Sequence, residues 1–234
     1  MSDLLHPWEV SPKEAVVIQK GLRQHLRIQP LDRAPELLAG VDLSYEIGGK
    51  ELWAAFVLLD PQSLEVVGWS GVKDAMRFPY VPGLLSFREV PALMKAWEQL
   101  DPKPDLIMVD GHGYAHPRRM GIACHLGLLT GTPAMGCGKN ILVGKHPPLE
   151  ETKGAAQPLL DGEELVGYVL RTRTRVKPMY ISAGHLMDQD SAKRAALQAV
   201  SKYRMPEPTR QAHLLVNRLR RGELAPGMVW KGAT

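Results

Sequence analysis

The sequence predicts an α/β domain built on a central mixed β-sheet flanked by helices. Two observations support this fold class. Three strand-like runs near the N-terminus are separated by short turns, and helical and strand-like segments then alternate along the chain. Short turns indicate antiparallel neighbours, whereas alternating helices and strands favour parallel pairing. The 234 residues suffice for one sizeable core, so we expect a single domain over residues 1–234.

The N-terminal half begins with a helix signal. Ser11, Pro12 and Glu14 have the spacing of an N-cap, a first helical residue and a capping-box partner. Strands are predicted at residues 37–45, 52–59 and 64–72, as an antiparallel meander. A proline-bounded loop at residues 78–85 then leads to a helix over about residues 87–100.

The C-terminal half alternates short strands and helices. Strands are predicted at residues 105–110, 133–137, 165–173 and 178–182, and helices at 118–129, 191–203 and 209–220. Gly131 is expected to end the first of these helices, and Pro206 and Pro208 to separate the last two. Residues 144–163, rich in proline, glycine and charge, are predicted to form a mobile loop.

Composition limits the class of protein. The net charge of +4 is compatible with a polyanionic partner, although many basic proteins bind no nucleic acid. We interpret the basic residues of the C-terminal half, Arg204 among them, mainly as a solvated face. Two distant cysteines provide neither a disulfide scaffold nor a zinc site. Residues 1–10 show no signal peptide and no segment is a membrane span, so we expect a cytoplasmic protein that is not bound to membranes.

Two strand-like runs end on an aspartate, Asp42 and Asp110. A strand can deliver a carboxylate to the edge of a sheet where ligands bind, although a single aspartate there more often caps a turn. Glu89 opens a predicted helix, where a carboxylate also favours the helix dipole. Clustered carboxylates repel one another unless a cation joins them, and oxygen ligands favour Mg²⁺ or Mn²⁺ over zinc.

The segment after Asp110 is rich in glycine and histidine. Gly111 and Gly113 allow a ligand to approach the backbone closely. His112 is interpreted as a hydrogen-bonded loop histidine, whereas His116 is open between that role and a ligand contact.

Two further segments complete the pattern. The loop Pro79–Pro82 encloses an aromatic residue that could replace a lost stacking partner between bases, or could simply pack on the surface. Lys139, in GCGKN at 136–140, can reach a phosphate, although the spacing of a P-loop is absent. Carboxylates for a cation, a lysine for a phosphate and a wedge for a base together predict metal-assisted phosphodiester hydrolysis.

These residues lie in strings that closely resemble endonuclease V, the deoxyinosine 3′-endonuclease family. The strings are AGVDLSYE at 39–46, PYVPGLLSFRE at 79–89, VDGHGYAHPRRMGIACHLG at 109–127, GCGKN at 136–140, KPMYISAGH at 177–185 and PTRQAHLL at 208–215. The resemblance implies a ribonuclease H-like fold for one catalytic domain. It also implies a nick at the second phosphodiester bond 3′ to a deaminated purine, which leaves 3′-hydroxyl and 5′-phosphate ends.

The resemblance assigns roles residue by residue. It implies that Asp42 and Asp110 bind the metal, and that Glu89 is a catalytic carboxylate that binds it directly or acts through water. Lys139 matches a contact to the scissile phosphate, and His213 matches a histidine near the metal centre on the last helix.

The resemblance also implies a recognition site. Its wedge comprises Pro79, Tyr80, Val81 and Pro82, with Val81 in place of the usual isoleucine. Its pocket for the flipped hypoxanthine includes Gly83, Leu85, Gly111 and Gly113, and His116 matches a position near the DNA. Arg88 is left open between a phosphate contact and a salt bridge.

The function we expect is therefore a DNA repair endonuclease that recognises deoxyinosine in duplex or single-stranded DNA. We expect Mg²⁺ as the cofactor, with Mn²⁺ able to substitute, and a monomer as the active form. Two alternatives stay open: a nuclease for inosine-containing RNA, and a non-catalytic protein that binds lesions or structured nucleic acid.

Overall fold

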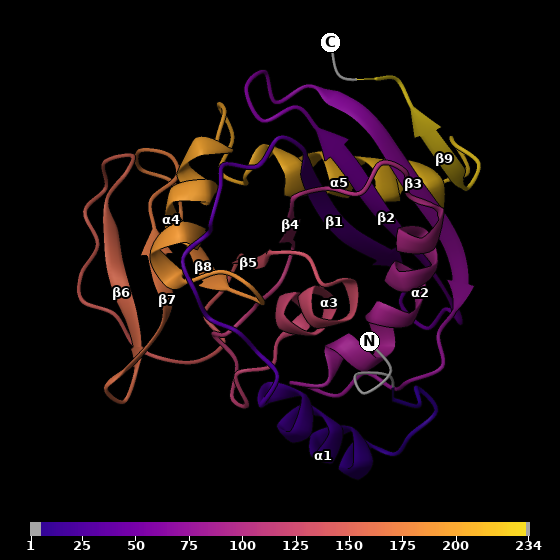
Figure 1. The fold of residues 1–234 in the computed structure, drawn as a ribbon, viewed down its shortest axis with the longest axis horizontal. Coiled ribbons are helices and arrows are strands. Elements are labelled where there is room, and N and C mark those ends of the chain that lie inside the picture. The colour runs from indigo at the N-terminus through magenta and orange to yellow at the C-terminus, as the bar shows by residue number, and fades with distance from the viewer. Residues whose placement is uncertain (1–5, 233–234) are drawn as a thin grey trace.

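The structure, a computed structural model, describes residues 6–232 and contains the predicted mixed sheet flanked by helices (Figure 1). Within these residues the sheet has nine strands in the order β6-β7-β8-β5-β4-β1-β2-β3-β9. The elements are α1 (Pro12–Arg23), β1 (Leu38–Tyr45), β2 (Glu51–Leu59), β3 (Val66–Ala75), α2 (Leu85–Gln99), β4 (Leu106–Val109), α3 (Ile122–Thr130), β5 (Ala134–Gly138), β6 (Ala156–Asp161), β7 (Glu164–Leu170), β8 (Met179–Ala183), α4 (Gln189–Gln198), α5 (Glu207–Arg220) and β9 (Gly227–Trp230).

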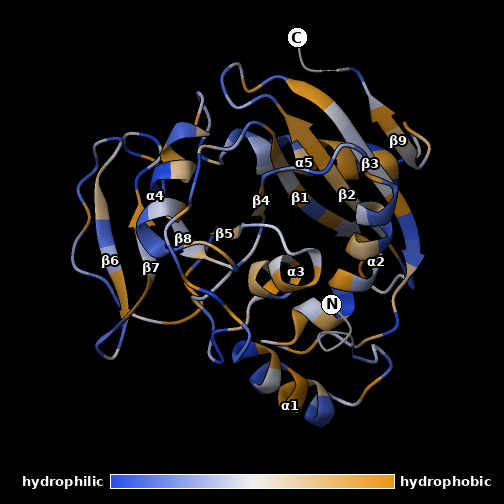
Figure 2. Cartoon of the chain, in the orientation of Figure 1, coloured by the Kyte–Doolittle hydropathy of each residue, from blue (hydrophilic) through white to orange (hydrophobic). Residues whose placement is uncertain are grey.

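The sheet separates two apolar layers. Strands β1, β2 and β3 form the predicted antiparallel meander, and β1, β4 and β5 pair in parallel. Helices α2 and α3 pack on one face, whereas α4 and α5 pack on the other. In Figure 1, α5 passes behind β1–β3 and α2 and α3 lie in front. Figure 2 shows that the central strands are strongly hydrophobic, as strands covered on both faces must be.

Helix α1 begins as the sequence predicts. The Ser11 hydroxyl accepts a hydrogen bond from the amide of Glu14 at 3.3 Å, and the Ser11 amide donates to the Glu14 carboxylate at 2.7 Å. This reciprocal capping box satisfies two amides that the first helical turn leaves without partners. The strands predicted at residues 165–173 and 178–182 correspond to β7 and β8, which pair in antiparallel fashion.

Several predicted helices have different bounds: α2 and α4 each begin two residues early, and α4 ends at Gln198 rather than at residue 203. Helix α3 begins at Ile122 rather than at residue 118, because Arg119 has a φ of 55° and Gly121 is the N-cap. Its end is as predicted, with Gly131 in the left-handed conformation. Pro206 is the N-cap of α5, but Pro208 lies within its first turn, where a missing amide costs no helical hydrogen bond.

Two strands were not predicted. Residues 144–163 are not simply a loop, because they contain β6, which pairs with β7. Pro158 is unfavourable in most strands because proline has no amide donor. Strand β6 tolerates it because β6 is at the edge of the sheet. Strand β9 closes the opposite edge by pairing with β3.

Some expectations lie beyond what the structure tests. Residues 1–5, half of the segment on which the expectation of no signal peptide depends, lie outside the described residues. From residue 6 to residue 232, no helix combines the length and apolar character needed to cross a membrane. The single domain over residues 1–234 stays a prediction.

Candidate active site

Asp42 and Asp110 are neighbours because β1 and β4 pair in parallel. Their register sets Val41 opposite Val109, and the amide of Asp110 donates to the Val41 carbonyl at 3.0 Å. Asp110 follows the last residue of β4, as predicted. Asp42 does not end its strand: β1 continues to Tyr45 along β2, with Asp42 opposite Ala55. Asp42 nevertheless lies level with Asp110, because β4 is shorter than β1 and ends with Val109 opposite Val41.

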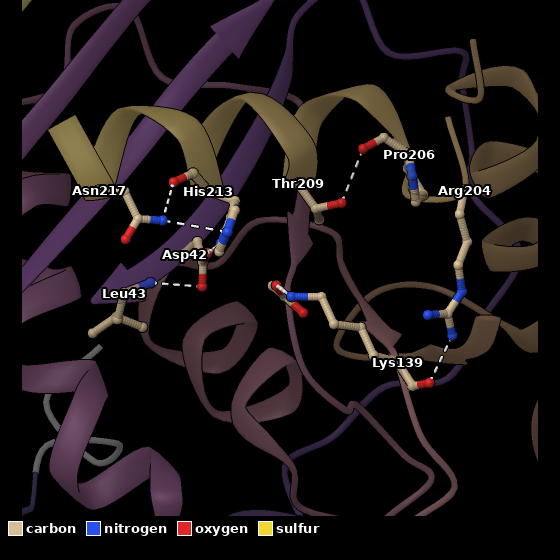
Figure 3. Close-up of polar contacts among 9 residues, drawn as sticks. Asp42, Leu43, Lys139, Arg204, Pro206, Thr209, His213 and Asn217 are labelled. Carbon is tan, nitrogen blue, oxygen red and sulfur yellow. Dashed lines mark hydrogen bonds and ion pairs between the residues drawn. The ribbon is translucent and has the colours of Figure 1, made fainter. Parts of the chain in front are cut away.

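Lys139 reaches the same place from the next parallel strand. Strand β5 pairs with β4 with Gly136 opposite Val109, and the chain then delivers Lys139, whose ammonium group contacts the Asp110 carboxylate. The Arg204 guanidinium donates to the carbonyls of Lys139 and Pro178 at 2.7 and 2.6 Å. Figure 3 shows Arg204 directed at Lys139 in this way. The interpretation of Arg204 as part of a solvated face is therefore wrong.

His213 approaches the carboxylates from α5 on the other side (Figure 3). Its Nδ1 lies 2.8 Å from Oδ2 of Asp42, which raises the pKa of His213. Asn217 donates to the His213 carbonyl at 2.8 Å. Helix α5 can approach this closely because residue 40 is glycine: a Cβ at Gly40 would lie 1.8 Å from the carbonyl oxygen of Pro208.

These side chains form a group that fits a divalent cation. Ligand atoms of Asp42, Asp110 and His213 all lie within 4.8 Å of one another. Burial and the charge of Asp42 raise the pKa of Asp110. A carboxylate whose charged form is disfavoured by another carboxylate is the setting in which a bound cation lowers the free energy.

Glu89 lies beside this group on α2. It is buried, and its pKa is raised to about 8 by burial first and by the charge of Asp42 next. Asp110 adds to the rise, and Arg88 opposes it. The group of three within 4.8 Å does not include Glu89. Whether it binds metal directly or acts through water stays open.

A cavity of about 180 Å³ is lined in part by Gly111 and His112, the two residues that follow Asp110 in the chain. Seven of the residues predicted for recognition line it: Tyr80, Val81, Pro82, Gly83, Leu85, Gly111 and His116. Pro79 and Gly113 do not. Gly113 packs against β8 instead, and its amide donates to the Ser182 hydroxyl at 2.9 Å. The other lining residues were not predicted for recognition: Gln19, Ser86, His112, Met120, Gly121, Ile122 and Leu142.

The wedge loop, Pro79–Pro82, is held in place through the carbonyl group of the next residue, Gly83. The oxygen of Gly83, a residue with a φ of 77°, receives hydrogen bonds from Gln19 at 3.1 Å, His116 at 3.0 Å and Arg118 at 2.6 Å. We call these four residues the Gly83 anchor. Gln19 is buried in α1 and also donates to the Met120 carbonyl at 3.2 Å. Nothing near Gln19 in the sequence signals this role, because all its partners are distant along the chain.

His116, left open by the sequence, has both ring nitrogens occupied. Its Nδ1 accepts from the amides of Arg118 and Met120 at 3.2 and 3.4 Å, so Nε2 carries the hydrogen donated to Gly83. Burial lowers the pKa of His116 to about 4, which keeps the ring neutral. His116 therefore positions the wedge loop, and its nitrogens are not directed at a ligand.

Arg88 forms no salt bridge within residues 6–232, so that alternative is wrong, whereas its phosphate contact stays a prediction. Its guanidinium donates to the Phe78 carbonyl at 3.2 Å and lies 4.9 Å from the centre of the Tyr45 ring. Arg88 thus holds the chain immediately before the wedge loop.

Known proteins are similar to this chain in sequence and in fold. The Endonuclease V family profile matches residues 20–214. An Endonuclease V from Myxococcus xanthus is 50% identical over 217 residues, which cover 92% of each chain. The crystal structure of Endonuclease V from Streptomyces avermitilis is 40% identical, with a TM-score of 0.87 over 92% of this chain and 96% of that one. Endonuclease V from Ciona intestinalis, in complex with a 24mer DNA containing an inosine, shares the fold, with a TM-score of 0.81 at 23% identity over 91% of this chain and 98% of that one.

Proposed function

The chain belongs to the endonuclease V family, and we propose that it is a Mg²⁺-dependent endonuclease that recognises deoxyinosine in DNA. It cleaves the second phosphodiester bond 3′ to the lesion. The observation that carries this proposal is the convergence of Asp42, Asp110, His213 and Lys139 beside a cavity behind an exposed aromatic loop.

The first part of the proposal concerns the metal. Asp42 and Asp110 would hold it through carboxylate oxygens, the ligands that suit Mg²⁺ and Mn²⁺, and a ring nitrogen of His213 lies within reach of the same ion. The cation neutralises phosphate oxygens and lowers the pKa of a bound water. A fourth group, the ammonium of Lys139, is half-exposed and contacts the scissile phosphate.

Glu89 is the proton acceptor in this proposal. General base catalysis is most efficient when the pKa of the base is close to the working pH. Without a metal the pKa of Glu89 is raised to about 8, and a cation held by Asp42 and Asp110 would lower it toward neutral pH. Its burial beside Asp42 and Asp110 is what supplies the shift.

The second part of the proposal concerns the base. Tyr80 is 64% exposed at the tip of the wedge loop, where its ring can replace the stacking lost when a base leaves the helix. Inosine pairs poorly, so its extrusion costs less than that of a normal base. The cavity behind Tyr80 and Val81 receives it. We further propose that the active form is a monomeric, cytoplasmic single domain that accepts duplex or single-stranded DNA.

One assay tests this function. A labelled duplex with one deoxyinosine is incubated with Mg²⁺, with Mn²⁺ or with EDTA, beside the same duplex with deoxyadenosine. We expect one nick, at the second bond 3′ to the lesion, with either metal and on the inosine strand alone. Binding of the inosine duplex without a nick in Mg²⁺ would instead support a non-catalytic binder. A strand with inosine in RNA, run in parallel, tests the endoribonuclease alternative.

A further inference from the structure

The chain that precedes α1 is joined to α3 by a pair of histidines. We call residues 6–10 the N-terminal strap. Nε2 of His6, on this strap, lies 2.8 Å from Nε2 of His125, on α3, although 119 positions separate the two residues. The side chain of His125 is completely buried, and within residues 6–232 its other ring nitrogen has no hydrogen-bond partner. In the described part of the chain, the strap therefore supplies the one hydrogen bond that this buried ring makes.

The direction of this hydrogen bond follows from the neighbour of His6. Its Nδ1 lies 2.9 Å from the carbonyl oxygen of Pro7, which can only accept, so Nδ1 carries a hydrogen. Burial lowers the pKa of His6 and lowers the pKa of His125 to about 3, so both rings are neutral at neutral pH. Nε2 of His125 therefore donates to Nε2 of His6. Without His6, the buried ring of His125 would have an N–H group with no partner, which is unfavourable.

Aromatic packing holds the strap in the same place. Trp8 stacks on His125 with ring centres 5.3 Å apart, and it meets Phe87 of α2 edge-on at 5.9 Å. The His6 ring lies 4.4 Å from the Trp8 ring and 5.3 Å from the Phe87 ring. Aromatic pairs at such distances stabilise a fold beyond the area that they bury. Four rings from the strap, α2 and α3 thus form one aromatic cluster.

This aromatic cluster continues to the wedge loop. Phe87 packs on Phe78, the residue immediately before that loop, with ring centres 5.7 Å apart. Phe78, Leu84 and Phe87 are each at most 3% exposed and belong to one apolar cluster. Trp8 of the strap and Val81 of the wedge loop both pack against that cluster. The strap and the wedge loop therefore share one support.

We propose that the N-terminal strap positions the wedge loop, and that the hydrogen bond between His6 and His125 fastens the strap. This inference rests on the proposed function, which gives the wedge loop its role in binding the lesion. A loop that is already ordered loses less conformational entropy when DNA binds, so its ordering raises affinity. His6 and Trp8 are positioning residues, because neither lines the cavity nor belongs to the group that fits the cation.

Hydrogen–deuterium exchange, followed by NMR without DNA, tests the strap directly. The reporters are the amides of Leu84 and Phe87, which donate to the carbonyls of Val81 and Leu84 at 2.9 and 3.1 Å. In His6→Ala, their exchange should become roughly two- to tenfold faster, because a hydrogen bond that resists local opening is lost. The amide of Ile107 in β4, 2.9 Å from the Pro133 carbonyl, is the internal reference and should not change.

Three further variants sharpen this measurement. His6→Gln retains an acceptor for His125 and should restore most of the slow exchange. Trp8→Leu keeps the histidine pair and removes the stacking on His125, so it should accelerate exchange at the same two amides. The matched control is His25→Ala, because His25 is an exposed histidine just after α1. It should behave as the unmodified protein does.

Steady-state cleavage of the inosine duplex supplies a second measurement. His6→Ala should raise KM by roughly two- to tenfold and retain kcat, because the wedge loop loses its support while the carboxylates stay in place. A variant that merely folds less completely would instead lose apparent kcat and keep KM. His6→Gln should return KM most of the way to the value of the unmodified protein.

The outcomes separate this inference from the proposed function. Unchanged exchange at Leu84 and Phe87 in both His6→Ala and Trp8→Leu would show that the strap does not hold the wedge loop. An equal acceleration at Ile107 would also contradict the inference, because it indicates a general loss of stability. If the unmodified protein does not cleave the inosine duplex, the proposed function fails, and the exchange rates still decide whether the strap holds the loop.

Discussion

Two nearby regions differ in how their polar groups are stabilised: the carboxylate edge, formed by Asp42, Asp110 and Glu89, and the Gly83 anchor. At the edge, Asp42 and Asp110 lie side by side with Glu89 behind them, and the pKa values of Glu89 and Asp110 are both raised. At the anchor, one carbonyl oxygen receives three donors and the histidine is neutral. The edge contains unfavourable contacts between like charges, which a cation relieves. The anchor is satisfied by the protein alone.

This difference predicts that substitutions at the carboxylate edge change mainly activity, whereas substitutions at the Gly83 anchor change mainly stability. Replacing a charge at the edge removes repulsion and should leave the fold intact, because catalytic groups are often held at some cost in stability. Replacing a donor at the anchor leaves a buried polar group without a partner, which destabilises the fold. Three experiments, given in order of decreasing effect, test this predicted difference between the two regions.

The largest effect is expected for Asp110→Asn. It retains the shape of the side chain and removes a proposed metal ligand, so single-turnover cleavage should fall on the order of a thousandfold. Affinity for the inosine duplex should change little, because the cavity is untouched. Its Tm should stay level or rise, since the raised pKa of Asp110 shows that its charged form is disfavoured. Undiminished turnover would refute the metal role of Asp110, and a large fall in Tm would contradict the comparison itself.

An intermediate effect is expected for Gln19→Leu at the anchor. It leaves the Met120 carbonyl and the Arg118 guanidinium without the Gln19 partner and removes one donor from Gly83. The free energy of unfolding should fall by about 1–3 kcal/mol, measured by urea denaturation. KM for the inosine duplex should rise while kcat is retained, because the wedge loop loses its position and the edge does not. The matched control is Gln24→Leu, because Gln24 is an exposed glutamine at the end of the same helix. An equal loss of unfolding free energy in this control would contradict the role assigned to Gln19.

The third experiment concerns the pH dependence of stability set by Glu89, which changes the free energy of unfolding by at most about 1.4 kcal/mol for each pH unit. Its pKa rises from 4.5 to about 8 on folding, so the folded state favours the protonated carboxyl. The resulting stabilisation is complete below pH 4.5 and is lost as the pH rises through about 8. In EDTA, the Tm of the unmodified protein should therefore fall across this range relative to Glu89→Gln, which is neutral at every pH. Glu98→Gln, at an exposed position of the same helix, is the control. Parallel Tm curves for Glu89→Gln and the unmodified protein would contradict the assigned pKa.

Local patterns predicted much of the fold. The capping box of Ser11 and Glu14, the meander of β1–β3 and the glycine that ends α3 all depend on residues close together in the sequence. The predictions failed where a distant partner decides the structure. Strand β6 exists because β7 pairs with it, despite Pro158, and β9 because the edge of β3 accepts it.

The candidate site shows the same contrast between features set by local patterns and features set by distant partners. Local strings in the sequence predicted Asp42, Glu89 and Asp110 as the carboxylates of the site, and the structure brings Asp42 and Asp110 together. The packing of distant elements was needed to show that Arg204 holds the Lys139 carbonyl, and that Gln19 and His116 anchor Gly83. These contacts join residues tens of positions apart. A hydrogen bond between such residues depends on how whole elements pack, and short-range patterns carry no information about that packing.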